Sequence, residues 1–271
     1  NLWARFKIVF EENVQSIEIL EPPRKQSVSK GSSPPHFVTV RFATYVSGIL
    51  VLNEEKQHAI LNECIRQLRS AFERLLSRFA DKIEEEKSRI VFLITNYSVV
   101  VSAMNTQALD KSKMCKEFSD NLARMEDEYI EMELKEHFTR WIGFMSTTET
   151  KLHSEPKTKV DMSQILSIVK NFNETWQRAL NNAVRNVQEN FTPNIAASLA
   201  QEVGNEELFK ISKDVLKRML SQVLLYHSRF SKLVERLMSN QGRDSEVLKY
   251  MVPEHVIRGE MKAYWNKDGK D

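Results

Sequence analysis

The sequence is poor in the residues that make tight turns: glycine and proline each occur only 7 times among 271 residues. So low a count argues against a β-sandwich, a propeller or another fold built on many tight turns. It also leaves little material for a glycine-rich phosphate loop, and the motifs GxGxxG, GxxxxGK[ST], GxSxG and HExxH are all absent. The sequence therefore predicts a non-enzyme, with no catalytic residue, no cofactor-binding residue and no cofactor.

Neither sign of charge is in clear excess, since 39 Lys and Arg stand against 37 Asp and Glu. A dedicated nucleic-acid binder usually carries a basic excess, so no nucleic-acid partner is predicted. The two cysteines, Cys64 and Cys115, have no CxxC partner, and we expect reduced thiols. Glu133 and His137 lie four residues apart without a third ligand nearby, which favours a solvated helix face over a metal site. No apolar run approaches the roughly 20 residues that span a bilayer.

What the sequence has in abundance is helical periodicity, because apolar residues recur every three or four positions almost throughout. One unbroken stripe consists of Ile165, Val169, Phe172, Trp176, Leu180, Ala183, Val187 and Phe191. Similar stripes run from Leu61 to Ile83 and from Leu208 to Leu237. Residues 91–101 are rich in β-branched side chains, yet they continue a helical pattern, so we predict a buried helix there.

Breaks in this pattern divide the chain into two predicted helical bundles. Residues 22–36 hold four prolines and several serines, which predicts a flexible loop within the first bundle. Residues 148–160 are polar and predict a linker. The predicted domains are therefore a first bundle over residues 1–147 and a second over residues 161–271, each of long antiparallel helices.

Four phrases along the chain resemble one protein family. They are residues 1–16 (NLWARFKIVFEENVQS), 35–47 (PHFVTVRFATYVS), 91–97 (VFLITNY) and 225–230 (LYHSRF). Their content and order resemble the C-terminal region of the family of the vacuolar-protein-sorting subunit fifty-two, a component of the Golgi-associated retrograde protein (GARP) tethering complex. The likeness is dense up to about residue 100 and patchy beyond. None of the phrases is a catalytic motif; all are packing patterns.

The resemblance implies an all-α fold, an elongated rod of two stacked antiparallel helical bundles as in other multisubunit tether subunits. It implies a non-catalytic subunit that tethers endosome-derived vesicles at the trans-Golgi network, on the cytosolic face of that compartment and of endosomes. The implied partners are the other GARP subunits, a Rab-type Golgi GTPase in its GTP state, SNARE proteins and the Golgi membrane surface. The alternative is a phosphoinositide-binding module at the membrane surface, in a tether such as exocyst.

Two sets of residues are candidates for these contacts. Large aromatic side chains beside an arginine are typical of interaction hot spots, and they occur together as Phe37, Arg41, Phe42 and Tyr45. Residues 210–236 hold seven basic and two acidic residues, and helical spacing predicts one basic ridge from Lys210, Lys213 and Lys217, suited to an acidic membrane or partner. For the aromatic set, core positions are an open alternative.

Overall fold

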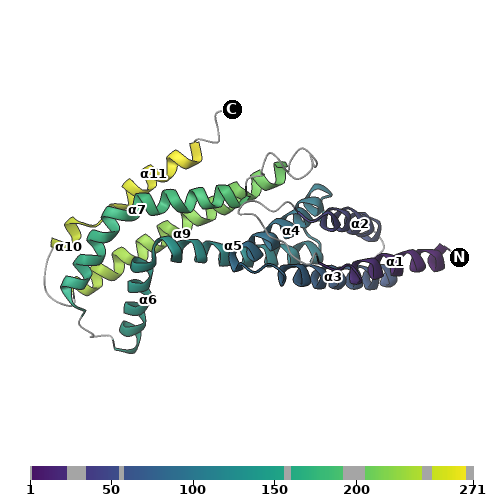
Figure 1. The fold of residues 1–271 in the computed structure, drawn as a ribbon, viewed down its shortest axis with the longest axis horizontal. Helices are drawn as coiled ribbons and strands as arrows, with labels where there is room; N and C mark the ends of the chain where they lie inside the picture. Colours follow the sequence, from purple (N-terminus) through teal and green to yellow (C-terminus); the bar gives the residue numbers. More distant parts are fainter. Residues whose placement is uncertain are drawn as a thin grey trace. The chain divides into compact units, whose positions relative to one another are not determined.

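The structure is a computed structural model that describes residues 2–22, 35–54, 58–155, 160–191, 205–239 and 246–266. These ranges contain helices and turns but no strand (Figure 1). The predicted all-α class is therefore confirmed. Over the same ranges, no helix combines the length and the apolar character needed to cross a bilayer.

The chain divides into two compact units, of which the first comprises Asn1–Tyr129 and Gln188–Lys213. It contains α1 (Leu2–Glu18), α2 (Phe37–Glu54), α3 (Ala59–Ala80), α4 (Glu86–Thr106) and the first part of α5 (Lys113–His137). Helix α1 packs on α3, and α2 packs on both α3 and α4. Stacked and edge-to-face rings fill this core, with Phe42, Phe72 and Phe118 in mutual contact.

The second unit comprises Ile130–Val187 and Asp214–Asp271. It contains the end of α5, α6 (Thr139–Ser154), most of α7 (Met162–Phe191) and of α9 (Asn205–Ser239), and the short α10 (Glu246–Lys249) and α11 (Glu254–Asn266). An aromatic cluster forms its core, where the Trp141 ring lies 4.6 Å from Phe172 and 5.9 Å from Phe230.

Two boundary predictions differ from what the structure shows. The predicted linker, residues 148–160, is helical up to Ser154, because Thr148 and Leu152 are buried and continue the apolar face of α6. Residues 156–159, and residues 23–34 of the predicted loop, lie outside the described residues. The two compact units also do not coincide with the predicted domains 1–147 and 161–271, because residues 188–213 belong with the first unit.

Candidate functional site

The outer face of α2 is the surface on which the first candidate residues lie. The helix is apolar nearly all round, and Arg41 and Glu54 are its only charged residues. One side is buried against α3 and α4 through Phe42, Ala43, Val46 and Ile49. The exposed side, called here the α2 outer face, consists of Phe37, Arg41, Thr44, Gly48, Val51 and Leu52. A helix that is apolar all round is normally buried on every side, so this exposure needs a physical explanation.

Two neighbours, the ring of His36 and the guanidinium of Arg41, hold the ring of Phe37 in place at the start of α2. Phe37 is 46% exposed. The centroid of the His36 ring lies 4.6 Å from that of Phe37. The His36 ring also contacts Phe79 of the core, with 4.7 Å between the ring centroids. The guanidinium of Arg41 lies 5.4 Å above the Phe37 ring, within cation–π range. An exposed aromatic side chain that is already ordered loses little conformational entropy when a partner binds it.

The other two predicted contact residues lie elsewhere. Phe42 is only 3% exposed, and its ring stacks on Phe72 at 3.9 Å with an angle of 4° between the planes. It is therefore a core residue, and the exposed part of the candidate set is Phe37 and Arg41. Tyr45 is half-buried, and burial, followed by the nearby Cys64 thiol, raises the pKa of its hydroxyl.

Sequence reasoning missed the rest of the α2 outer face. Val51 and Leu52 are 42% and 76% exposed, and a side chain added at Gly48 would meet nothing within 4 Å. These positions follow Phe37 at helical spacing along one side of α2. The sequence carried no signal for this side, because α2 is apolar nearly all round and its pattern does not distinguish exposed from buried positions.

A buried asparagine fixes where α2 begins. Asn96 of α4 is fully buried, and its Oδ1 accepts hydrogen bonds from the His36 backbone N–H at 3.0 Å and the Thr39 hydroxyl at 2.5 Å. Its Nδ2 donates to the Phe92 carbonyl at 2.7 Å. The Asn96 amide therefore satisfies a backbone donor that the start of α2 would otherwise leave unpaired. It also joins two of the four family phrases, residues 35–47 and 91–97, in space.

The three lysines of the second candidate set are exposed on α9. Lys210, Lys213 and Lys217 follow one another at intervals of three and four residues. Between them, Ile211, Val215 and the neighbouring Leu216 are buried. Whether the three lysines act as one binding ridge stays a prediction.

The expected solvated helix face at Glu133 and His137 is not what the structure shows. Glu133 is fully buried, and its Oε2 lies 3.2 Å from His137 Nε2. Asn186 of α7 donates from Nδ2 to the same carboxylate oxygen at 3.1 Å. This polar group joins α5 to α7 inside the second unit, and no local pattern in the sequence indicates that Asn186 of α7 is its third member.

Both cysteines lie in surroundings that make their thiols unreactive. Cys64 and Cys115 are buried free thiols, and burial raises the pKa of each, which lowers the thiolate fraction that a nucleophile needs. Within the described ranges, no group of three His, Cys, Asp or Glu residues is arranged to hold a metal ion.

Comparison with known proteins gives a consistent answer. A family model described as "Vps52, C-terminal" matches residues 1–130. Vacuolar protein sorting-associated protein 52 A of Arabidopsis thaliana is 23% identical over 265 residues, which are 97% of this chain and 35% of that protein. The human vacuolar protein sorting-associated protein 52 homolog is 22% identical over 237 residues, 87% of this chain and 30% of the human protein. The Caenorhabditis elegans homolog is 20% identical over 269 residues, 97% of this chain and 36% of that protein.

This chain thus spans about a third of the length of these relatives. No solved structure matches it significantly. The matched residues 1–130 include the α2 outer face and the Asn96 contacts. The resemblance inferred from the four phrases is thereby confirmed: the chain is similar to the Vps52 proteins over most of its length, and its residues 1–130 match the model of the Vps52 C-terminal family.

Proposed function

We propose that this chain is the C-terminal part of a non-catalytic subunit of a GARP-type tether, acting in endosome-to-trans-Golgi retrograde transport. Support comes from its similarity to vacuolar protein sorting-associated proteins 52 of plants, mammals and a nematode. The other GARP subunits are its proposed constant partners, with SNARE proteins and the cytosolic surface of trans-Golgi and endosomal membranes as further contacts.

Within this role, the α2 outer face is the proposed binding site for a Rab-type Golgi GTPase in its GTP state. The observation that carries this proposal is the exposed apolar side of α2, with its ordered Phe37 ring and the 76% exposed Leu52. Switch regions of such GTPases are ordered by the γ-phosphate and released on hydrolysis. A rigid apolar helix face can therefore bind the ordered switch surface with higher affinity than the released one.

The test is a binding measurement with purified Golgi Rab proteins, each loaded with GDP or with a non-hydrolysable GTP analogue. We expect binding only in the GTP state, and the variant Phe37→Ala combined with Leu52→Ala should weaken it by about 30-fold, as for loss of an interface hot spot. Ile8→Ala, a truncation of a 58% exposed apolar residue on α1, is the matched control. Equal binding of both nucleotide states, or an equal effect of the control, would contradict the proposal.

A membrane-surface role is the second candidate, favoured by the three exposed lysines of α9. Flotation with phosphoinositide-containing liposomes tests it at about 50 and 500 mM salt, because an electrostatic contact between exposed charges weakens as salt rises. Lys210→Glu, Lys213→Glu and Lys217→Glu together should abolish flotation. Flotation that persists in this variant or ignores salt would contradict a role for these lysines.

A further inference from the structure

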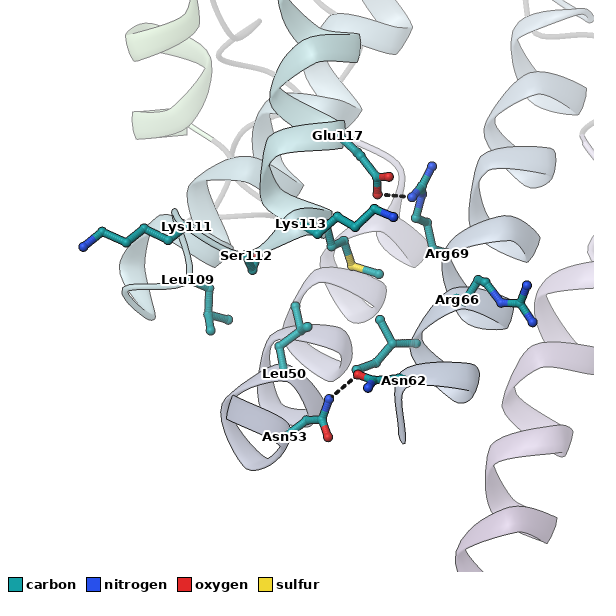
Figure 2. A pocket seen from close by; sticks show the side chains of 12 residues that line it. Leu50, Asn53, Asn62, Arg66, Arg69, Leu109, Lys111, Ser112, Lys113 and Glu117 are labelled. Atoms are coloured by element: carbon teal, nitrogen blue, oxygen red, sulfur yellow. Dashed lines mark hydrogen bonds and ion pairs between the residues drawn. The ribbon is translucent and has the colours of Figure 1, made fainter. Parts of the chain in front are cut away.

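A pocket in the first unit combines apolar walls with a basic rim. It has a volume of about 560 Å³, within the range of ligand sites in proteins. It lies where the end of α2, the first turns of α3 and the α4–α5 connection come together (Figure 2). None of the contacts predicted from the sequence involves this pocket.

The walls are apolar and well ordered. They are formed by Leu50, Ile65, Leu109 and Met114, of which the last three are buried. One edge is fixed by the hydrogen bond from Asn53 Nδ2 to Asn62 Oδ1, at 2.6 Å, which joins α2 to α3.

The turn that presents Leu109 is held in an unusual conformation. The preceding residue, Ala108, has φ of 56°, and it is the one non-glycine residue of the described ranges with a positive φ. The Leu109 N–H donates to the Met104 carbonyl at 2.9 Å, which closes the end of α4. Together with the bond from the Ala108 N–H to the Asn105 carbonyl, at 3.0 Å, this is a Schellman motif, a common way for a helix to end, and it fixes the position of Leu109 in the pocket wall.

Among the described residues that line the pocket, four side chains are cationic and one is a carboxylate. Arg66 and Arg69 come from α3, Lys111 from the turn before α5 and Lys113 from the first position of α5, and the carboxylate is Glu117. Figure 2 shows Arg66 and Lys111 pointing outward at opposite sides, whereas Lys113 extends toward Arg69 and Glu117.

These charges are only partly neutralised within the protein. Arg69, 29% exposed, pairs with Glu117 and with Glu73, whose Oε1 lies 3.1 Å from its Nε. Arg66 is 75% exposed and pairs with the exposed Glu63, a contact of little energetic weight. Lys111 and Lys113, both exposed, add two further positive charges at the pocket mouth, which attract carboxylates.

The two features together favour a ligand that carries both an apolar group and carboxylates. A free anion or a lipid head group would leave the walls formed by Leu50, Ile65, Leu109 and Met114 unused, and a purely apolar ligand would leave the rim unpaired. A peptide can satisfy both, with a large apolar side chain in the pocket and carboxylates on either side of it. Guanidinium and ammonium groups form their strongest hydrogen bonds with such carboxylates.

We propose that this pocket binds a short acidic peptide segment of a partner protein, with a large apolar residue between acidic ones. The apolar side chain contacts Leu109 and Met114, and the flanking carboxylates pair with Arg66, Lys111 and Lys113. The site is separate from the α2 outer face, so it adds a second protein contact to the proposed tether role.

Fluorescence anisotropy with the whole 271-residue chain tests the proposal. The probe is a fluorescein-labelled peptide with leucine and phenylalanine between two pairs of aspartates. Two control peptides replace either the apolar pair by serines or the aspartates by lysines. We expect saturable binding of the first peptide alone, weakened several-fold between about 50 and 300 mM NaCl.

Charge reversal of the rim should reduce the affinity at least tenfold, in the double variant Lys111→Glu with Lys113→Glu. Both side chains are exposed, so the fold should persist, and an unchanged circular dichroism spectrum verifies this. The matched control reverses two other exposed lysines of the first unit, Lys7→Glu with Lys82→Glu.

Three outcomes would overturn the proposal. They are no saturable binding below about 1 mM peptide, equal weakening by the control variant, and equal binding of the serine-substituted peptide. Lipid vesicles containing phosphoinositides serve as a further arm. If the rim variant loses vesicle binding while no peptide binds, the pocket recognises a membrane head group instead and the peptide proposal fails.

Discussion

Replacing Asn96 by alanine should destabilise the first unit by about 3 kcal/mol. The Asn96 side chain makes three hydrogen bonds in a fully buried position, with His36, Thr39 and Phe92. Alanine removes the acceptor from the His36 N–H and the Thr39 hydroxyl, and the donor to a carbonyl of its own helix. A donor left unpaired costs roughly 1–3 kcal/mol. Both the His36 N–H and the Thr39 hydroxyl lose their acceptor, so both contribute to the loss.

The assay is equilibrium urea denaturation followed by circular dichroism, with Asn13→Ala as the control. Asn13 is an exposed asparagine of α1, and its replacement should change the unfolding free energy by less than about 0.5 kcal/mol. A double-mutant cycle with Thr39→Val isolates the bond between the two side chains. Because the two side chains are in direct contact, the double variant should lose about 1 kcal/mol less unfolding free energy than the sum of the two single variants.

Two results would contradict this prediction: a loss of unfolding free energy below about 1 kcal/mol for Asn96→Ala, or a double variant whose loss equals the sum of the two single losses. Either result would mean that water or another group satisfies the start of α2 without help from α4. A further consequence concerns the α2 outer face. Because Asn96 fixes the backbone next to Phe37, its loss should also weaken binding of the proposed GTPase, while leaving the basic pocket unaffected.

Three further predictions concern packing, backbone strain and pH. Phe72→Ala removes the ring that stacks on Phe42 in the core and should cost about 3–5 kcal/mol in urea denaturation. Ala108→Gly relieves a φ of 56° and should raise the unfolding free energy by up to about 1 kcal/mol; a loss of stability would show that the turn is unstrained. Burial lowers the pKa of His227, while the backbone contact at Val252 and the charge of Glu254 partly offset this lowering. As the pH falls, the His227 imidazole is therefore protonated in the unfolded chain before it is protonated in the folded one. Stability should be complete above the ordinary histidine pKa of 6.5 and decline below it, by at most about 1.4 kcal/mol per pH unit, and His227→Gln should flatten that slope in denaturation measured between pH 7.5 and 5.

The long amphipathic helices could be predicted from the sequence because one local rule decides them. Every member of the stripe from Ile165 to Phe191 is buried, as helical spacing requires. Helix α4 was predicted against its β-branched composition, and the structure confirms it. In both cases the period of the pattern and the length of the run carry the information, and no distant contact is needed.

Helix α2 marks where that rule fails. When nearly every position is apolar, periodicity cannot distinguish the inward from the outward side. Phe37 and Phe42 therefore looked equivalent in sequence, although one is 46% and the other 3% exposed. The difference comes from α3 and α4, which cover one side of α2 only.

Unit membership and the basic pocket depend on contacts between distant segments. Residues near 190 belong to the first unit because Asn190 donates to the Tyr129 hydroxyl at 2.9 Å and the Phe191 ring lies 5.1 Å from that of Tyr129. Proline and serine mark breaks in the chain, but they do not say which helices pack together. The pocket likewise joins Arg66 to Lys113, which lies 47 positions further along the chain, and no local pattern links them.

The two proposed surfaces share α2, and this sharing makes them distinguishable by experiment. Leu50 and Asn53 line the pocket, and helical spacing places them on the side of α2 away from Phe37 and Leu52 of the outer face. A globular GTPase seated on Phe37 and a short peptide seated beside Leu50 can therefore bind independently. In that case Phe37→Ala leaves peptide affinity unchanged, and charge reversal at Lys111 and Lys113 leaves GTPase affinity unchanged. If each variant weakens both interactions, one extended partner covers the whole of α2, and the assignment of two separate partners is wrong.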